Sequence, residues 1–378
     1  MKKILFIFGT RPEAIKIAPV YNKFLKNKKF KTYVCITSQH KKMLSEVIDI
    51  FGIKVDYDLN IMKKNQDIEH VTTSILKKLN NLFKIFSPDL VIVHGDTTTT
   101  FSASLSAFYN KIKVAHIEAG LRSNNLLEPY PEEFNRKITS ILSNLHFAPT
   151  FQNKKNLLKE GIKSNRIYVT GNTVIDSIYY LNNKAKSDES FKTISLKKIN
   201  KLLNFDITNH NYILITCHRR ENFGNTLSNI CDSLIDLAKK FKSYNFVYPV
   251  HLNPNVFSLV TRKLSKISNI YLIPPQNYIN FYFIMKFCYL VITDSGGLQE
   301  EAPSLNKPLI IIRNITERNE IILNRNGILA GTEKKNIIYK TSLLIENKLL
   351  YKKMSLKKNP YGNGNASEKI MQKIEKYF

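Results

Sequence analysis

At 378 residues, 43% of them hydrophobic, the chain exceeds what one hydrophobic core usually organises, which predicts two domains with a site in the cleft between them. Its four separated cysteines exclude a zinc ribbon or disulfide framework, and no apolar run approaches the roughly 20 residues of a membrane span, so a reduced, cytoplasmic setting is expected. The formal net charge of +27 comes from lysines scattered over every segment, which favours compositional drift over a nucleic-acid partner.

Short runs rich in Ile, Val and Tyr alternate along the chain with longer stretches of helical period. This alternation is typical of βαβ units around a parallel sheet, and it predicts an α/β fold with two Rossmann-like domains. The expected strands of the first domain are 4–8, 33–36, 90–94, 114–117 and 167–169, and those of the second are 212–216, 246–250, 270–273, 290–293 and 309–312.

Two stretches outside these strands bear on the domain organisation. Residues 182–211 are rich in Lys, Asn and Ser and are expected to form a surface excursion near the domain junction. The stretch 333–378 is expected to be helical apart from a break at 359–364, where a turn can send the last helix back across the N-terminal domain.

The first expected strand runs into a glycine turn. Gly9 permits a tight turn, and Pro12 suits the first position of a helix. Arg11 then lies at a strand's end and a helix's start, where a guanidinium and backbone N–H groups suit a phosphate, and Lys16 follows one turn later. An ordinary turn with solvated charges explains these residues equally well.

The expected strand 90–94 ends at His94 and is followed by Asp96 and four threonines, residues 97–100. Asp96 suits a helix N-cap, which is a purely structural role. Any of the threonines can cap instead and free this carboxylate.

By the period-two rule, His116 and Glu118 share one face of the next strand, with the same spacing as His94 and Asp96. These four side chains could form a metal site. However, buried parallel strands often end in satisfied polar residues, and neither an HExxH motif nor a further ligand set is present. No metal is therefore expected.

A third set of acids, Glu132 and Glu133, opens a helix, where the helix dipole favours negative charge on structural grounds alone. Adjacent helical residues point in different directions. One of these acids can therefore face a cleft while the other is solvated.

The second half of the chain carries basic groups and a glycine turn at its strand ends. His218 and Arg219 follow one expected strand and His251 follows another, as anion contacts or as surface basic residues. The Ser-Gly-Gly turn at 295–297 lets backbone N–H groups approach a pyrophosphate at a helix start. Glu301, one turn into that helix, can accept hydrogen bonds from two ribose hydroxyls.

Taken together, these segments resemble the non-hydrolysing bacterial UDP-N-acetylglucosamine 2-epimerases. Each motif is weak alone, but they occur in register from Met1 to about Gly364. The matching segments are 8–14, 94–96, 118–122, 131–133, 171–173, 218–221 and 293–302.

The resemblance implies a fold like that of the GT-B glycosyltransferases, UDP held mainly by the C-terminal domain, no cofactor and a homodimer. We expect an N-terminal domain of 1–170, with 362–378 packing back on it, and a UDP-binding domain of 171–361. The implied contacts with UDP and its phosphates are Arg11, His218, Gln276, Phe281, Ser295, Gly296, Gly297, Glu301 and Arg318. The residues implied in the chemistry are Asp96, Glu118 and Glu132, with Lys16 nearby and with His218 as a cation that helps the pyrophosphate to leave.

Two positions depart from the family pattern. Asn319 replaces a usual proline, which is expected to loosen the loop carrying Arg318. Ser74 replaces an arginine that in some members helps to bind a second, activating UDP-sugar, which places activation by substrate in doubt. Other parts of that second site are matched by Gln39, His40, Arg219 and His251.

The chemistry implied is reversible epimerisation at C2 of UDP-N-acetylglucosamine to UDP-N-acetylmannosamine, for surface polysaccharide precursors. Because no carbonyl flanks the C2 proton, UDP is expelled to give a 2-acetamidoglucal, and it adds back after reprotonation on the other face. The alternatives are a hydrolysing epimerase that releases N-acetylmannosamine and UDP, a GT-B glycosyltransferase, and a binding protein without turnover. The three carboxylates disfavour the last, because UDP recognition needs cations.

Overall fold

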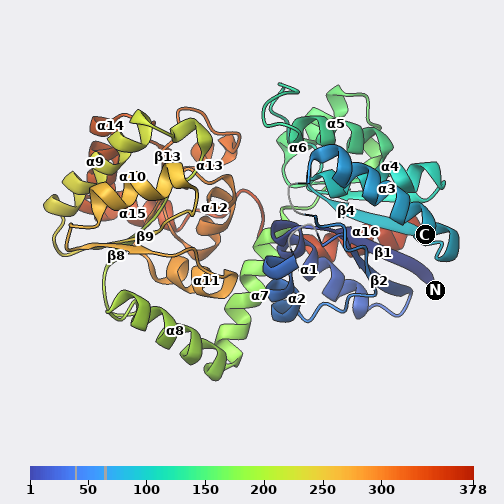
Figure 1. The fold of residues 1–378 in the computed structure, drawn as a ribbon, viewed down its shortest axis with the longest axis horizontal. Helices are drawn as coiled ribbons and strands as arrows, with labels where there is room; N and C mark the ends of the chain where they lie inside the picture. Colours follow the sequence, from blue (N-terminus) through green and yellow to red (C-terminus); the bar gives the residue numbers. More distant parts are fainter. Residues whose placement is uncertain (39–40, 64–65) are drawn as a thin grey trace. The chain divides into compact units, whose positions relative to one another are not determined.

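A computed structural model describes residues 1–38, 41–63 and 66–378 (Figure 1). The chain divides into two compact units: unit 1 is Met1–Ser177 with Tyr361–Phe378, and unit 2 is Ile178–Pro360. Each unit is a parallel sheet with helices packed on it, so the expected α/β class is confirmed. No helix in the described part of the chain is both long and apolar enough to cross a membrane.

Unit 1 is built on a parallel sheet with the strand order β3-β2-β1-β4-β5-β6-β7. The strands are β1 (Lys2–Phe8), β2 (Phe30–Ile36), β3 (Tyr57–Asp58), β4 (Leu90–His94), β5 (Lys113–Ile117), β6 (Leu145–Ala148) and β7 (Ile167–Val169). Its helices are α1 (Arg11–Leu25), α2 (Lys41–Phe51), α3 (Ile68–Ile85), α4 (Thr98–Tyr109), α5 (Glu132–Leu142), α6 (Phe151–Lys159) and α16 (Ala366–Tyr377). All five strands expected in this half are present, whereas β3 and β6 were not predicted.

Unit 2 repeats the same order on a smaller sheet, β10-β9-β8-β11-β12-β13. The strands are β8 (Tyr212–Thr216), β9 (Asn245–Pro249), β10 (Ile270–Ile273), β11 (Val291–Thr293), β12 (Leu309–Ile311) and β13 (Gly327–Leu329). Its helices are α8 (Glu189–Leu203), α9 (Asn225–Lys240), α10 (Pro254–Leu264), α11 (Tyr278–Phe287), α12 (Gly296–Glu301), α13 (Asn319–Leu323), α14 (Lys334–Glu346) and α15 (Lys348–Ser355). Again the five expected strands are present, and β13 was not predicted.

The strand order gives each sheet a switch point. In unit 1, β1 pairs with β2 on one side and β4 on the other. In unit 2, β8 pairs with β9 and β11 in the same way. The connections after the two central strands leave in opposite directions there, and ligands of doubly wound folds bind at the carboxyl ends of these strands.

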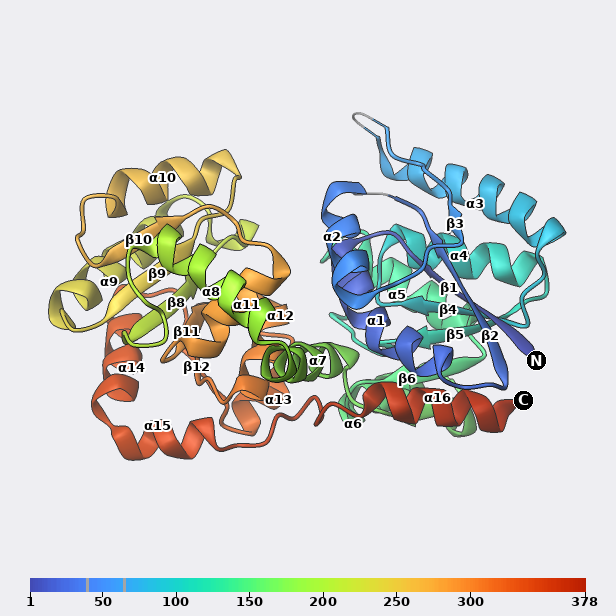
Figure 2. The ribbon, with the colours of Figure 1, turned by 90° about the horizontal axis from the view of Figure 1, so that it is seen from below.

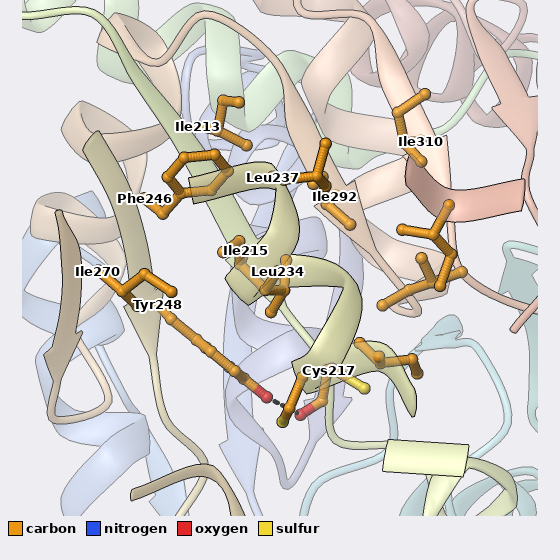
Figure 3. Packing of buried hydrophobic residues seen from close by; sticks show 14 of the residues in the cluster. Ile213, Ile215, Cys217, Leu234, Leu237, Phe246, Tyr248, Ile270, Ile292 and Ile310 are labelled. Carbon is orange, nitrogen blue, oxygen red and sulfur yellow. Dashed lines mark hydrogen bonds between the residues drawn. The ribbon is translucent and has the colours of Figure 1, made fainter. Parts of the chain in front are cut away.

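The core of unit 2 fixes the end of β8 (Figure 3). Side chains of α9 such as Leu234 and Leu237 pack against the apolar face of the sheet. Tyr248 of β9 is fully buried among them, and its hydroxyl donates a hydrogen bond of 2.8 Å to the carbonyl of Cys217. A buried tyrosine hydroxyl needs such a partner. This bond therefore holds the chain in place immediately before His218.

The expectation of a surface excursion at 182–211 is wrong. Helix α7 (Thr173–Ser187) runs from unit 1 into unit 2, and α8 follows it with Ile199 and Leu203 buried. The side chain of Asp188 caps α8 by accepting a bond of 2.9 Å from the Phe191 backbone. The Lys and Asn residues lie on the outer face of an amphipathic helix, so composition alone was misleading.

The expected return of the last helix is confirmed. After α15 the chain breaks around 359–364, and α16 packs against α1 within unit 1 (Figure 2). Asp176 of α7 fixes the start of α16 by accepting hydrogen bonds from the backbone of Ala366 and Ser367 at 3.2 and 2.8 Å. These bonds satisfy N–H groups that have no partner inside a helix.

Candidate functional site

The switch point of unit 1 gathers residues that the sequence placed far apart. Arg11 follows β1, Asp96 follows β4 and Glu118 follows β5, and these three strands are neighbours in the sheet. All three strands are parallel, so their carboxyl ends lie at one edge. Arg11 is the first residue of α1 and is partly exposed, and Lys16 lies on the same helix.

Glu118 lies directly beyond β5 in the left-handed region, with φ +64°. Its carboxylate forms an ion pair with Lys16 and accepts a hydrogen bond of 2.9 Å from the Asn172 amide. The Oε2 atom also lies 3.7 Å from Nε2 of His94. The carboxylate is thus held between a cation, an amide and a buried imidazole, with 11% of its side-chain surface exposed.

The expectation that His116 and Glu118 share a strand face is wrong. His116 is fully buried and its Nε2 atom lies 2.7 Å from the carbonyl oxygen of Gly95. Because Glu118 has left the strand with a positive φ, the period-two rule no longer applies to its side chain. The imidazole beside Glu118 is that of His94.

Three histidines are buried in the sheet beneath these carboxylates. Burial lowers the pKa of His94 to about 4, that of His116 to about 3 and that of His146 to about 4. All three are therefore neutral near pH 7. Over residues 1–38, 41–63 and 66–378, no three His, Cys, Asp or Glu side chains are grouped to hold a metal ion.

Asp96 is not the cap of α4. The side chain of Thr97 caps this helix by accepting from the Thr100 backbone at 3.1 Å, so the threonine alternative is the correct one. The Asp96 carboxylate instead pairs with Arg136, at 2.6 Å from Nη2 and 2.9 Å from Nε. Charge-assisted bonds to a guanidinium fork orient a carboxylate strongly.

The two acids at the start of α5 point in different directions, as expected, but neither is simply solvated. Glu133 is fully buried, where it accepts from Arg136 at 3.0 Å and from the backbone of Ser123 at 3.0 Å. Glu132 is partly exposed, yet its Oε2 atom is buried without a hydrogen-bond partner among the described residues. Buried polar atoms nearly always have a hydrogen-bond partner, so this oxygen is an exception that points to a functional role.

Two side chains of this site were missed by sequence reasoning. Arg136 bridges Asp96 and Glu133, and its spacing of three residues from Glu133 on a helix was an available signal. Asn172 reaches Glu118 from the start of α7. The segment 171–173 was matched to the family, which was an available signal, but the match gave Asn172 no role. β5 and α7 are separated by β6 and β7, so the pattern around Asn172 did not show that it contacts Glu118.

The switch point of unit 2 is organised by a buried acid. Asp294 follows β11 and is fully buried, and its Oδ2 atom accepts from the backbones of His218 and Arg219, both at 2.8 Å. The amide of Asn222 donates to the same atom at 3.0 Å. The turn after β8 is thereby fixed to the end of β11. Burial lowers the pKa of His218.

The Ser-Gly-Gly turn lies beside an arginine. Gly296 begins α12, and a β-carbon built there would lie 3.0 to 3.2 Å from the guanidinium of Arg318. The same guanidinium pairs with Glu300 at 3.0 Å. Glycine at 296 therefore gives the guanidinium of Arg318 the room for this close approach. Arg318 precedes α13 and its first residue, Asn319.

The other predicted contacts lie on the same unit. Gln276 precedes α11 and donates to the carbonyl of Pro274 at 2.7 Å, whereas Phe281 is a partly buried residue of α11. Ser295 immediately precedes α12, and Glu301 is the last residue of α12.

The residues matched to a second UDP-sugar site are only partly described. Gln39 and His40 lie outside the described residues. The ring of His251 stacks on that of His218, with centroids 5.5 Å apart and planes at 13°. In α3, the Ser74 hydroxyl lies 3.4 Å from Nε2 of His70.

Comparison with known proteins gives a consistent result. Residues 22–375 match a family model described as UDP-N-acetylglucosamine 2-epimerase. The UDP-N-acetylglucosamine 2-epimerase of Neisseria meningitidis is 49% identical over 99% of each chain, and that of Campylobacter jejuni is 49% identical over 98% of this chain and 97% of its own.

Solved structures of several epimerases are similar to this chain along its whole length. The UDP-GlcNAc 2-epimerase of Neisseria meningitidis bound to UDP-GlcNAc has a TM-score of 0.91 at 49% identity, covering 99% of this chain and 100% of its own. That of Methanocaldococcus jannaschii in complex with UDP-GlcNAc and UDP has a TM-score of 0.83 at 32% identity, covering 100% of both chains. The expected GT-B-like α/β fold is confirmed by these likenesses.

Proposed function

The chain belongs to the UDP-N-acetylglucosamine 2-epimerase family, and we propose that it interconverts UDP-N-acetylglucosamine and UDP-N-acetylmannosamine without hydrolysis. The observation that carries this proposal is the contrast between two carboxylates on neighbouring strands. Asp96 is held by the guanidinium of Arg136, whereas Glu118 is held by Lys16 and Asn172. Carboxylates in different environments can act separately as acid and base.

The reaction proceeds by elimination and re-addition. A carboxylate removes the C2 proton, the C1–O bond to the β-phosphate breaks with its electron pair going to UDP, and a C1=C2 double bond forms. A second group then returns a proton to the other face of C2 while UDP adds back to C1. Positioned proton transfer of this kind contributes about 10² to 10⁴ in rate.

The groups for proton transfer are Asp96, Glu118 and Glu132 of unit 1. Glu132 offers a buried oxygen without a hydrogen-bond partner among the described residues. Lys16 forms an ion pair with the carboxylate of Glu118 and so holds it in place. Arg11, at the start of α1 on the same edge of the sheet, contributes a cation for the β-phosphate.

Unit 2 holds the UDP. Arg318 supplies a cation, and the Ser-Gly-Gly turn at 295–297 supplies backbone N–H groups beside it. Because burial lowers the pKa of His218, its imidazole contributes as a neutral N–H donor and not as the cation expected from sequence. Glu301 accepts the ribose hydroxyls, and Gln276 and Phe281 contact the nucleotide. Each donor to the developing charge is worth roughly 3 kcal/mol by analogy with oxyanion holes. Retention of UDP by these groups is what allows re-addition in place of hydrolysis.

The proposal extends to the setting of the enzyme. It works as a cytoplasmic homodimer without a cofactor, and its product serves as a precursor of a surface polysaccharide. Two relatives with solved structures were bound to UDP-GlcNAc, which supports this nucleotide sugar as the substrate.

The deciding experiment is incubation with UDP-N-acetylglucosamine in D₂O, followed by mass spectrometry and NMR. We expect UDP-N-acetylmannosamine that carries deuterium at C2. Free N-acetylmannosamine and UDP would show a hydrolysing enzyme, and epimerised product without deuterium would rule out proton exchange. Transfer of the sugar to an added acceptor would instead favour the glycosyltransferase.

A further inference from the structure

A buried carboxylate outside the groups assigned above joins the two turns at the switch point of unit 1. Glu13, on the first turn of α1, is only 2% exposed. Its Oε2 atom accepts from the backbones of Gly9 and Thr10 at 3.1 and 2.8 Å, and from the Thr10 hydroxyl at 2.8 Å. Its Oε1 atom faces the hydroxyls of Thr97 and Thr100 at 2.7 and 3.2 Å.

These two turns carry residues of the proposed site. Arg11 directly follows Thr10, and Asp96 directly precedes Thr97. The backbone pairing of β1 with β4 ends at Phe6 and Ile92 within the described residues, before either turn begins. The sheet itself therefore does not set the separation of the turns, and the side chain of Glu13 spans the gap.

Glu13 makes more hydrogen bonds than a cap of α1 requires. The bond from the Thr10 backbone to Oε2 already supplies the part of Glu13 in the capping box of α1. The bond from Thr97 to Oε1 adds nothing to that cap, but it links α1 to the residue that caps α4. The Oε1 atom of Glu13 thus joins two turns, whereas Oε2 serves only the turn before α1.

We propose that Glu13 is a positioning residue, which fixes the turn carrying Arg11 against the turn carrying Asp96. This inference rests on the proposed function, because it assigns both turns to one reaction. Glu13 does not itself touch the substrate, since both of its oxygens are taken up by the protein. Small misplacement of reacting groups lowers the rate steeply, and about 1 Å can cost 10²-fold.

The test is a double-mutant cycle on the rate of C2 deuterium incorporation. Glu13→Ala removes the link from one side and should lower kcat about 10²-fold. Thr97→Val removes the shorter of the two hydroxyl contacts on the other side and leaves that of Thr100, so it should lower kcat only about 10-fold. If both substitutions act through the same link, kcat of the double variant should fall about 10²-fold, as in Glu13→Ala alone. It should not fall by the product of the two single losses. The dissociation constant of UDP should change much less than kcat does, because Arg11 is the only proposed contact with UDP that lies on a turn held by Glu13.

Matched variants separate positioning from folding. Glu13→Gln can keep its oxygen toward the α1 turn and its amide toward the threonines, and Thr97→Ser keeps the hydroxyl, so both should recover most of kcat. Glu13→Asp keeps the carboxyl group but is one methylene too short to span both turns. It should lose about 10-fold in kcat at an unchanged midpoint of thermal unfolding, which provides a folded variant if Glu13→Ala does not fold.

The outcomes are distinguishable. An active wild-type enzyme whose two single losses multiply in the double variant overturns this inference alone, as does a loss of kcat that only follows the folded fraction. A wild-type enzyme that incorporates no deuterium into a UDP-sugar overturns the proposed function, and this inference with it.

Discussion

The Oδ1 atom of Asp294 lies 3.4 Å from Nδ1 of His218, while the other oxygen of the same carboxylate holds the His218 backbone. The imidazole is therefore oriented from both its ring and its main chain. The Asp294 charge therefore lies beside the Nδ1 edge of the His218 ring, and it acts on that ring through space.

Asp294→Asn should shift the titration of His218 to lower pH. Burial already lowers the pKa of this imidazole, the Asp294 charge raises it, and His251 and Arg219 lower it further. Removing the carboxylate charge leaves only the lowering contributions. The check is an NMR titration of the His218 ring, with Asp232→Asn, which removes a surface charge paired with Lys263, as the control. An unchanged titration would show that Asp294 serves the backbone alone.

Glu118→Gln should abolish turnover and retain UDP binding. The amide cannot take a proton from C2, and it also loses the ion pair with Lys16. We expect kcat to fall at least about 10²-fold. Steady-state kinetics and calorimetry with UDP measure the two effects separately. Lost UDP binding in a folded variant would reassign Glu118 to recognition.

Gly296→Ala should weaken UDP binding with little effect on stability. The new methyl group would meet the Arg318 guanidinium at 3.0 to 3.2 Å, and this partly exposed side chain can move away. We expect about a tenfold higher dissociation constant for UDP, which is roughly 1.4 kcal/mol. The control is the double variant with Arg318→Ala. If Gly296 acts through Arg318, the second change removes most of the effect of the first.

Acidification should destabilise the protein through its buried histidines. The pKa values of His94, His116 and His146 are lowered from 6.5 to about 4, 3 and 4 in the folded state. The unfolded chain therefore binds more protons below pH 6.5, so the stabilisation present above that pH is lost as the pH falls toward 4. Each histidine accounts for about 2 kcal/mol by pH 5.

Urea unfolding at pH 7.5, 6 and 5 measures this loss. His146→Leu removes one titrating group from the core and should reduce the loss by about a third. A free energy of unfolding that does not change over this range would contradict the assignment of neutral histidines.

Much of the candidate site could be predicted from sequence because its residues lie at strand ends. The apolar runs of β4 and β5 marked where each strand ends. Asp96 follows β4 after one glycine, and Glu118 follows β5 directly. The strands β3, β6 and β13 escaped prediction. Strand β3 has only two residues, and β13 begins at a glycine. In β6 the polar His146 also interrupts the apolar run.

The pairing of these side chains could not be predicted. The positive φ of Glu118 turned it from His116 toward Lys16, and no strand pattern encodes such a turn for a glutamate. Arg136 and Glu13 each join groups from separate elements, so their partners depend on the order of strands in the sheet.

The sequence by itself therefore determined the α/β class, the places where strands become turns, and the family. These features are local or follow from motifs in register, and hydrophobic period and glycine position are sufficient for them. Tertiary structure alone decided which carboxylate meets which cation. Such partners are set by strand order across a switch point, where residues more than 80 positions apart, such as Glu13 and Thr97, come within a hydrogen bond of each other.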